Sequence, residues 1–232
     1  MNIYIVIPAK NEEKTIGNLV TAALLCGYSV IVVDDESSDA TVNIARSAGA
    51  IVLCNIKNLG AWKATQAGMR FAYKKGADVV ITMDADGQHD VVQIQKLIDS
   101  YQSGADVVIG NCVTRGSRGR HIAWRILKKI NRLDISDITS GFRLYNRVAM
   151  HTLISRQATM LEYQCVGILI MLRNMKLNIT EVSVPMSERA DGISRIFYSW
   201  KAVFYYLMYS TLLSVTKAYP TKKDKFLKNI TH

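Results

Sequence analysis

Short apolar runs rich in valine and isoleucine alternate with segments of helical length through the first half of the chain. The apolar runs are Ile3–Pro8, Val30–Asp34, Ala50–Cys54, Val79–Asp84 and Asp106–Ile109. The segments between them with helical period are Glu13–Cys26, Asp39–Ala48, Gly60–Lys75 and Val91–Ser103. Runs without polar alternation are typical of buried parallel strands. This order therefore predicts an α/β fold with a mainly parallel, twisted sheet flanked by helices.

Beyond Asn111 the pattern changes. Helices are predicted at His121–Leu133, Met160–Asn174 and Ile196–Thr216, with an extended segment at Ile179–Pro185 and a lysine-rich end. No Pro-rich or Ser/Gly-rich linker interrupts residues 1–219. We therefore expect one domain over residues 1–195, followed by an amphipathic aromatic helix and a basic tail over residues 196–232.

Composition places the chain among globular proteins of a reducing compartment. With 232 residues, of which 49% are hydrophobic, it can bury a sizeable core. Its four cysteines are widely spaced and lack the paired spacing of a zinc site. The first strand pattern begins almost at once, without the features of a signal peptide. These features predict a cytoplasmic protein.

The net charge of +10 favours an anionic partner, which in principle is a nucleic acid, an anionic lipid surface or a phosphorylated substrate. Basic residues crowd residues 115–132 and 217–228, although a solvated face explains each run equally well. Carboxylates at the strand ends would repel a nucleic-acid backbone, so nucleic acid is disfavoured. The aromatic helix and basic tail favour a peripheral membrane surface. The uncharged stretch Ala202–Val215 is shorter than the roughly 20 residues that span a bilayer.

An Asp-Ala-Asp sequence at Asp84 and Asp86 follows the fourth apolar run. The first carboxylate is held by the sheet edge and the second lies in the following turn, so both can face one cation. Gln88 can add a neutral oxygen ligand. Oxygen ligands of this kind suit Mg²⁺ or Mn²⁺, which also bind diphosphate oxygens. The alternative is a solvated acidic turn, because such short motifs are common.

Asp34 and Asp35 end the second run in the same way. A carboxylate at that place can accept hydrogen bonds from a ribose or from the imide N–H of a base. Ser38 or Asp39 is suited to cap the next helix. No Gly-x-Gly-x-x-Gly follows the first run, which disfavours a dinucleotide-binding dehydrogenase.

Six sequence blocks in this order resemble a known family. They are Val6–Glu13 (VIPAKNEE), Val32–Asp39 (VVDDESSD), Asn58–Gly60 with Ala64 and Gly68, Asp84–His89 (DADGQH), Ser140–Arg143 (SGFR), and Glu188–Arg189 with Gly192 and Ser194. Together they are similar to family 2 glycosyltransferases of GT-A fold, and among these to the dolichyl- or polyprenyl-phosphate mannose and glucose synthases. The resemblance covers about Ile3 to Arg195.

The resemblance implies an inverting, Mg²⁺- or Mn²⁺-dependent enzyme that moves a hexose from a GDP- or UDP-sugar to a polyprenyl phosphate. The nucleotide residues that it implies are Pro8, Asn11, Glu12, Asp35 and Asp84, and the implied metal ligands are Asp84, Asp86 and Gln88. The residues expected around the acceptor and its phosphates are Arg115, Arg118, Ser140, Arg143, Arg189, Ser194 and Arg195. Asp86, Arg143 and Asp137 are the candidate catalytic residues. Pro8-Ala9-Lys10 stands where the family often has Pro-Thr-Tyr, which leaves an aromatic stack on the base in doubt.

Two alternatives for the acceptor remain open. A phosphate acceptor is already ionised near neutral pH and needs no base, whereas a saccharide hydroxyl needs one, for which Asp137 is the candidate. A nucleotidyltransferase or a sugar-nucleotide-binding regulator would share the α/β layout. Nucleotidyltransferases usually have a glycine-rich loop after the first strand, which this sequence lacks. The sequence also leaves open the donor base and sugar, and whether the chain forms a homo-oligomer or joins a membrane-protein partner at the cytoplasmic face.

Overall fold

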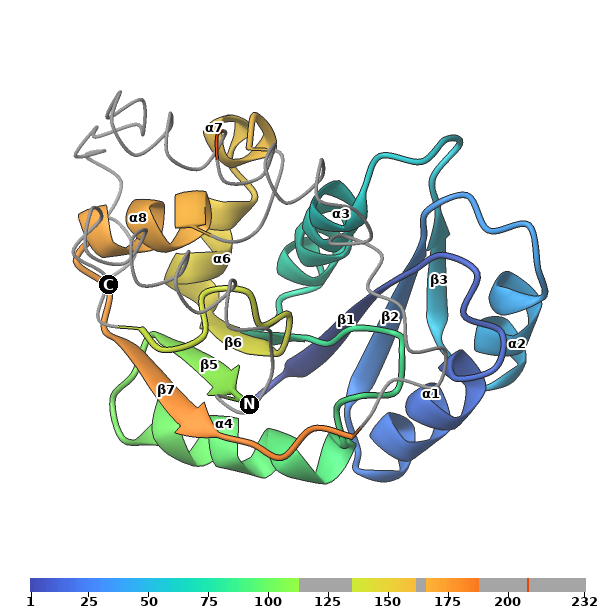
Figure 1. The fold of residues 1–232 in the computed structure, drawn as a ribbon, viewed down its shortest axis with the longest axis horizontal. Helices are drawn as coiled ribbons and strands as arrows, with labels where there is room; N and C mark the ends of the chain where they lie inside the picture. Colours follow the sequence, from blue (N-terminus) through green and yellow to red (C-terminus); the bar gives the residue numbers. More distant parts are fainter. Residues whose placement is uncertain (113–134, 162–165, 188–207, 209–232) are drawn as a thin grey trace.

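The computed structural model describes residues 1–112, 135–161, 166–187 and 208. Its centre is a seven-stranded sheet with the order β3-β2-β1-β4-β6-β5-β7 (Figure 1). The strands are β1 (Ile3–Ala9), β2 (Ser29–Asp34), β3 (Ile51–Cys54), β4 (Val79–Thr82), β5 (Val107–Asn111), β6 (Arg143–Asn146) and β7 (Ile179–Ser183).

The sheet is mainly parallel, as the sequence predicts. β1 pairs in parallel with β2 and β4, β2 with β3, and β5 with β7. β6 runs antiparallel to both of its neighbours, β4 and β5. This strand was not predicted, and it places Arg143 directly opposite Thr82. The segment after residue 140 is thereby brought to the end of β4.

Helices cover both faces of the sheet (Figure 1). One face carries α1 (Ile16–Leu25), α2 (Thr41–Ser47), the 3-10 turn η1 (Val91–Gln93) and α4 (Ile94–Gln102). The other carries α3 (Ala61–Lys74), α6 (Arg147–Leu153), α7 (Arg156–Thr159) and α8 (Val166–Asn174). The four helices predicted in the first half are confirmed, with ends displaced by a few residues. The helices α6 and α7 were not predicted.

Three predictions for the second half meet the structure differently. The segment predicted as one helix from Met160 begins its described helical part at Val166. The extended segment Ile179–Pro185 is confirmed as β7. The predicted helix at residues 121–133 lies outside the described residues, as does the aromatic helix at residues 196–216 apart from residue 208. No helix in the described part of the chain is long and apolar enough to cross a membrane.

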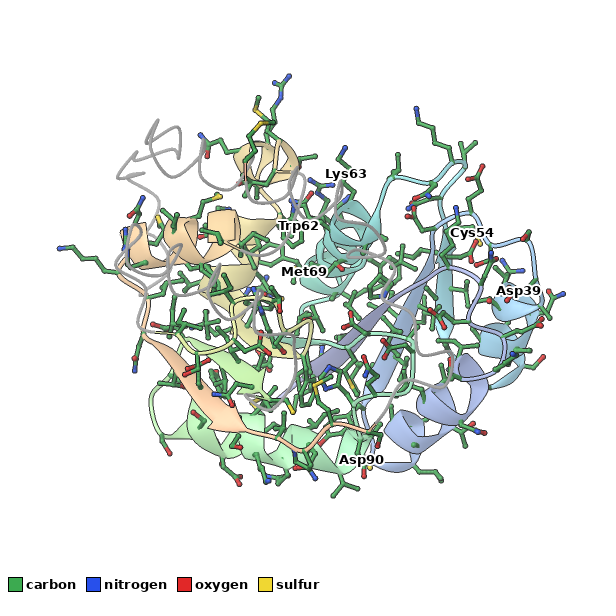
Figure 2. The ribbon with its side chains drawn as sticks, viewed as in Figure 1. Asp39, Cys54, Trp62, Lys63, Met69 and Asp90 are labelled. Carbon is green, nitrogen blue, oxygen red and sulfur yellow. The ribbon has the colours of Figure 1, made fainter. Side chains whose placement is uncertain are left out.

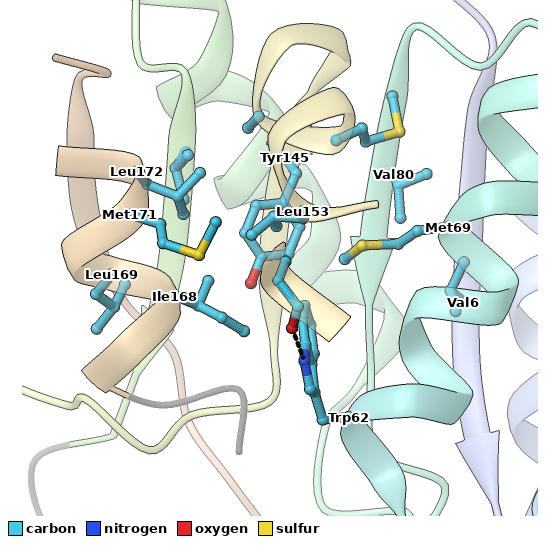
Figure 3. Packing of buried hydrophobic residues seen from close by; sticks show 14 of the residues in the cluster. Val6, Trp62, Met69, Val80, Tyr145, Leu153, Ile168, Leu169, Met171 and Leu172 are labelled. Carbon is cyan, nitrogen blue, oxygen red and sulfur yellow. Dashed lines mark hydrogen bonds between the residues drawn. The ribbon is translucent and has the colours of Figure 1, made fainter. Parts of the chain in front are cut away.

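The core consists of two apolar layers, one on each face of the sheet. In the layer beneath α3, Trp62 packs near Met69 and Tyr145 (Figure 3), and its indole N–H donates a 2.9 Å hydrogen bond to the Ala158 carbonyl. The indole thus buries apolar area while its single donor is satisfied. β3 departs from the prediction of a buried run, because Ile51 is 40% exposed and Cys54 is also exposed. Its place at the edge of the sheet explains the difference.

Candidate active site

The loops that follow β1 and β2 are joined at the carboxyl edge of the sheet. The backbone N–H of Asp35 donates to the Ala9 carbonyl at 2.8 Å, and that of Asn11 donates to Ser37 Oγ at 2.9 Å. The N–H of Met83 donates to the Val6 carbonyl at 3.1 Å, which brings the loop after β4 to the same edge. Ligands of open α/β sheets bind at this edge, beyond the carboxyl ends of the strands.

The acidic loop after β4 holds three candidate metal ligands. Asp84 is half-buried, whereas Asp86 and Gln88 are buried. The Gln88 backbone N–H donates to Asp86 Oδ1 at 3.1 Å, so the loop folds back on its second carboxylate. The side-chain amide of Gln88 donates from Nε2 to the Ser187 carbonyl at 3.2 Å. Its Oε1 is buried and accepts no hydrogen bond from the described residues.

This donor set fits Mg²⁺ or Mn²⁺ bound together with a diphosphate. A buried amide oxygen without a hydrogen-bond donor calls for a partner, and a cation between Gln88 and the two carboxylates would supply one. The described residues contain no group of three or more His, Cys, Asp and Glu side chains that could hold a metal by themselves. Mg²⁺ is commonly held by one or two carboxylates plus substrate phosphates, so a sparse set is the expected one.

Two other elements bind the backbone of the acidic loop. At the start of α1, Thr15 Oγ1 donates to the Ala85 carbonyl at 2.6 Å. Beyond β7, the Ser187 N–H donates to the Gln88 carbonyl at 3.0 Å. Neither Thr15 nor Ser187 was singled out in the sequence. Their roles depend on contacts between segments far apart in the chain, and no local pattern signals them.

At the end of β2, the two aspartates differ in how their oxygens are used. Both are buried. The carboxylate of Asp35 accepts three hydrogen bonds, and their donors are Asn55 Nδ2 at 2.9 Å and the backbone N–H groups of Leu59 and Gly60, both at 2.8 Å. Asp35 therefore holds the loop that begins α3. Asp34 accepts one bond, from the Ser37 N–H to Oδ2 at 3.2 Å, and its Oδ1 has no hydrogen-bond partner among the described residues.

The other candidate nucleotide residues lie in β1 and the loop after it. Pro8 is half-buried at the end of β1, opposite Val33. Asn11 has a positive φ of 54° and accepts the Ser38 N–H on Oδ1 at 2.8 Å. The Glu12 N–H donates to Thr41 Oγ1 at 2.8 Å. These contacts hold the first two strand-end loops together and bring Pro8, Asn11 and Glu12 to the same edge as Asp34 and Asp35.

The predicted acceptor residues within the described chain form a buried turn. Asp137 Oδ1 accepts from the N–H and hydroxyl of Thr139 and from the Ser140 N–H, at 2.9 to 3.1 Å. The hydroxyl of Ser140 donates to the Gly110 carbonyl at 2.6 Å. Arg143 is 0% exposed and donates from its guanidinium to the Ile138 carbonyl at 2.9 Å.

Glu181 in β7 supports this turn from outside, since its carboxylate accepts the N–H groups of Ser136 and Asp137 at 2.7 and 3.0 Å. The sequence had not indicated this contact. The other predicted phosphate-binding residues lie outside the described residues; they are Arg115, Arg118, Arg189, Ser194 and Arg195.

Helix starts beside the site are capped by nearby carboxylates. Asp39 accepts the Thr41 N–H at 3.0 Å at the start of α2, in line with its predicted capping role, although Ala40 is the residue at the N-cap position. Asp90 follows the acidic loop and accepts the Val92 N–H at 3.0 Å. In Figure 2, Asp39 lies beside α2 at the right of the view, and Asp90 lies near the start of α4 at the bottom.

Solved structures of other proteins share this architecture. The solved structure of glucosyl-3-phosphoglycerate synthase from Mycobacterium tuberculosis, in complex with Mn²⁺, UDP and phosphoglyceric acid, superposes with a TM-score of 0.71 at 20% identity, covering 96% of this chain and 80% of that one. The fold is therefore the GT-A fold of nucleotide-sugar transferases. The family model of glycosyl transferase family 2 matches residues 4–159. The chain belongs to this family and is a glycosyltransferase.

Two curated relatives have named substrates. The chain is 31% identical to the UDP-N-acetylglucosamine–dolichyl-phosphate N-acetylglucosaminyltransferase of Methanococcus voltae, with 78% of this chain and 84% of that protein covered. It is 28% identical to the polyprenol monophosphomannose synthase of Mycolicibacterium smegmatis, with 83% and 80% covered. Both names describe transfer of a sugar to a polyisoprenoid lipid, and the resemblance stated from the sequence blocks is confirmed.

Proposed function

We propose that this glycosyltransferase moves a hexose or related sugar from a UDP- or GDP-sugar to a polyprenyl phosphate, with Mg²⁺ or Mn²⁺ and with inversion at the anomeric carbon. The observation that carries the proposal is the loop after β4. There Asp84 and Asp86 are followed by Gln88, whose buried side-chain oxygen accepts no hydrogen bond from the described residues. The dolichyl-phosphate and polyprenol relatives support the choice of acceptor.

In this reaction an acceptor oxygen bonds to the anomeric carbon as the bond to the donor diphosphate breaks, and attack opposite the leaving group inverts that carbon. A bound Mg²⁺ or Mn²⁺ would neutralise the departing diphosphate. Asp84, Asp86 and Gln88 would hold this cation. Asp34 and Asp35 lie at the end of β2, where they can contact the nucleoside. Asp34 Oδ1, which has no hydrogen-bond partner among the described residues, can accept a hydrogen bond from the ribose or the base, while Asp35 positions the loop beside it.

A phosphate acceptor fits the surroundings of Asp137 better than a hydroxyl acceptor does. A general base must reach the proton that it removes, at about 2.6–3.2 Å. Asp137 is buried, and its Oδ1 already accepts three hydrogen bonds within its own turn. An ionised phosphate has no proton that must be removed. Arg143, at the other end of the same turn, would offset the charge of the acceptor phosphate together with Arg115, Arg118 and Arg189.

The proposed catalytic unit spans residues 1–195, and residues 196–232 would bring it to the cytoplasmic face of a membrane. The support is the aromatic and lysine-rich sequence of that segment and the lipid acceptors of the relatives. Each lysine near an anionic surface contributes about 1 kcal/mol to binding. The full chain should therefore sediment with phosphatidylserine vesicles in low salt and much less in high salt. Equal sedimentation with neutral vesicles would contradict the basic tail's role.

The function is tested by a matrix of donors and acceptors. The full chain is incubated with UDP- and GDP-sugars, with Mn²⁺ or Mg²⁺, and with a short polyprenyl phosphate, the matching polyprenol or a sugar acceptor, and the products are identified by mass spectrometry. We expect a phosphodiester-linked sugar lipid with only the phosphate acceptor, and none in excess chelator. Transfer to the polyprenol or the sugar, or full turnover in chelator, would contradict the proposal.

A further inference from the structure

Gly141 lies against the carboxylate of Asp84. A Cβ added to Gly141 would stand 2.5 Å from Oδ1, 2.6 Å from Oδ2 and 2.7 Å from Cγ of Asp84. Real Cβ atoms essentially never approach other atoms closer than 3.0 Å. The first aspartate of the acidic loop thus lies against a residue that comes 57 positions later in the chain.

Glycine is required here by space and not by backbone conformation. The glycines with positive φ in the described chain are Gly27, Gly49, Gly60, Gly76, Gly87 and Gly104, and Gly141 is not among them. An L-residue can therefore adopt the backbone conformation of Gly141 without the strain of the left-handed region. The three atoms nearest to the added Cβ all belong to the Asp84 carboxylate.

Rotation of the carboxylate cannot relieve the overlap. Because the two oxygens stand at nearly equal distances from the added Cβ, turning the group about its own axis moves one oxygen closer as the other recedes. Either the Asp84 side chain must leave its position or the backbone at Gly141 must move.

The backbone at Gly141 is held from three sides. Thr82 Oγ1 donates to the Gly141 carbonyl at 2.7 Å, the Gly110 N–H donates to the Phe142 carbonyl at 2.9 Å, and the Phe142 N–H donates to Ser140 Oγ at 3.2 Å. Thr82, Phe142 and Ser140 are buried, so these bonds are shielded from water. A methyl group added at Gly141 would therefore press against the Asp84 carboxylate while the backbone resists displacement.

We propose that Gly141 is a positioning residue for the metal and nucleotide-sugar site. By leaving the space that a Cβ would fill, it sets where the Asp84 carboxylate stands relative to Asp86 and Gln88. This rests on the proposed metal role of Asp84. The turn of residues 137–143 then belongs to the donor side of the site as well as to the acceptor side.

The test compares Gly141→Ala with Gly68→Ala in the full chain. Gly68→Ala is a matched control, because the atoms nearest to its added Cβ belong to Val6 and Val33 in the apolar core. Binding of Mn²⁺ is measured by the electron paramagnetic resonance signal of the free ion, with and without UDP or GDP. We expect Gly141→Ala to weaken Mn²⁺ binding about 10- to 100-fold, the usual effect of losing a group that orients a metal ligand. Gly68→Ala should lower the melting temperature and leave Mn²⁺ affinity near that of the parent.

A double-mutant cycle on thermal stability gives a readout that needs no metal. Gly141→Ala should lower the melting temperature of the parent clearly but that of Asp84→Ala little, because the truncated side chain leaves room for the methyl group. Equal losses in both backgrounds would overturn the inference, as would parental Mn²⁺ affinity in Gly141→Ala. A parent chain that binds no Mn²⁺ with either nucleotide would instead overturn the proposed function, and the role of Gly141 with it.

Discussion

The hydroxyl of Thr15 donates a 2.6 Å hydrogen bond to the carbonyl of Ala85, the residue between the two aspartates of the acidic loop. The first turn of α1 therefore holds the loop that ends β4. Thr15→Val keeps the shape of the side chain and removes the donor. We expect a loss of about 1 kcal/mol in the free energy of unfolding and about a tenfold weaker Mn²⁺ affinity. Urea unfolding and Mn²⁺ titration measure the two effects, and a change in stability alone would show that Thr15 does not position the loop.

Asp86→Ala should remove metal-dependent donor binding and leave the fold intact. Asp86 is 7% exposed, and loss of the hydrogen bond that it accepts from the Gln88 N–H should cost about 1 kcal/mol of stability. Loss of a direct ligand should weaken Mn²⁺ binding at least about 100-fold, more than loss of an orienting group. Asp90→Ala is the control, because Asp90 is exposed and caps η1. Calorimetric titration of each variant with UDP or GDP in the presence of Mn²⁺ distinguishes the two. If Asp86→Ala binds as tightly as Asp90→Ala, Asp86 is not a metal ligand.

Asp35→Ala should weaken nucleotide binding without changing the metal affinity measured in the absence of nucleotide. Because the carboxylate accepts the N–H groups of Leu59 and Gly60, the same change should also lower stability, by about 1 kcal/mol for each hydrogen bond that is lost. Asp34→Asn tests the neighbouring residue, whose Oδ1 has no partner among the described residues. Nucleotide titrations on folded samples measure both variants. If Asp35→Ala binds nucleotide as tightly as the parent, Asp35 is not part of the nucleotide site and only holds the loop that begins α3.

Asp137→Asn and Arg143→Lys distinguish the two classes of acceptor. If the acceptor is a phosphate, Asp137→Asn should cost less than about tenfold in kcat, since no proton is removed. If it is a hydroxyl, loss of the base should cost about 10² to 10⁴-fold. Arg143→Lys keeps the charge and loses the bidentate geometry, and it should raise KM for a polyprenyl phosphate. Arg143 is fully buried, so melting temperatures must accompany the kinetics. A several-hundredfold loss in a folded Asp137→Asn would move the enzyme to the hydroxyl-acceptor class.

Asp39 should make stability depend on acid pH. Burial raises the pKa of this carboxyl, but hydrogen bonds from the Thr41 hydroxyl and from the Thr41 and Glu13 N–H groups outweigh burial and hold the pKa below its ordinary value of 3.8. A lowered folded pKa gives stability that is present above 3.8 and is lost as the pH falls through the folded pKa. Asp39→Asn should therefore be less stable than the parent at neutral pH, and the difference should shrink in acid. A difference in melting temperature that stays constant with pH would contradict this.

The parallel half of the sheet was predictable because each of its strands is a continuous apolar run followed by a polar loop. β6 was not predictable in this way. It is four residues long, begins with the buried Arg143 and lies between β4 and β5, although it comes after both in the chain. A charged first residue signals a loop, and only the sheet as a whole supplies the burial that makes a strand of it.

The candidate site likewise combines features that the local sequence predicts with features that depend on distant parts of the chain. Asp84, Asp86 and Gln88 could be proposed as metal ligands from the sequence because they follow closely on the end of a predicted strand. Whether Asp34 or Asp35 keeps an open oxygen could not be predicted, because it depends on the loop that begins α3. The contacts of Gly141, Thr15 and Ser187 with the acidic loop join distant segments, and no local spacing reports them.

The position of β6 also bears on how the chain folds. β4 ends in the buried Thr82, and its partner Arg143 lies 61 positions later, so this pairing requires closure of a long loop. Until then, one edge of β4 presents the apolar residues Val79, Val80 and Ile81 with unpaired backbone groups, an arrangement that promotes association with other strands. A nascent chain that stops short of residue 146 should aggregate through this edge. Synthesis of β6 is then the step that lets the chain cover this edge of β4 and avoid aggregation.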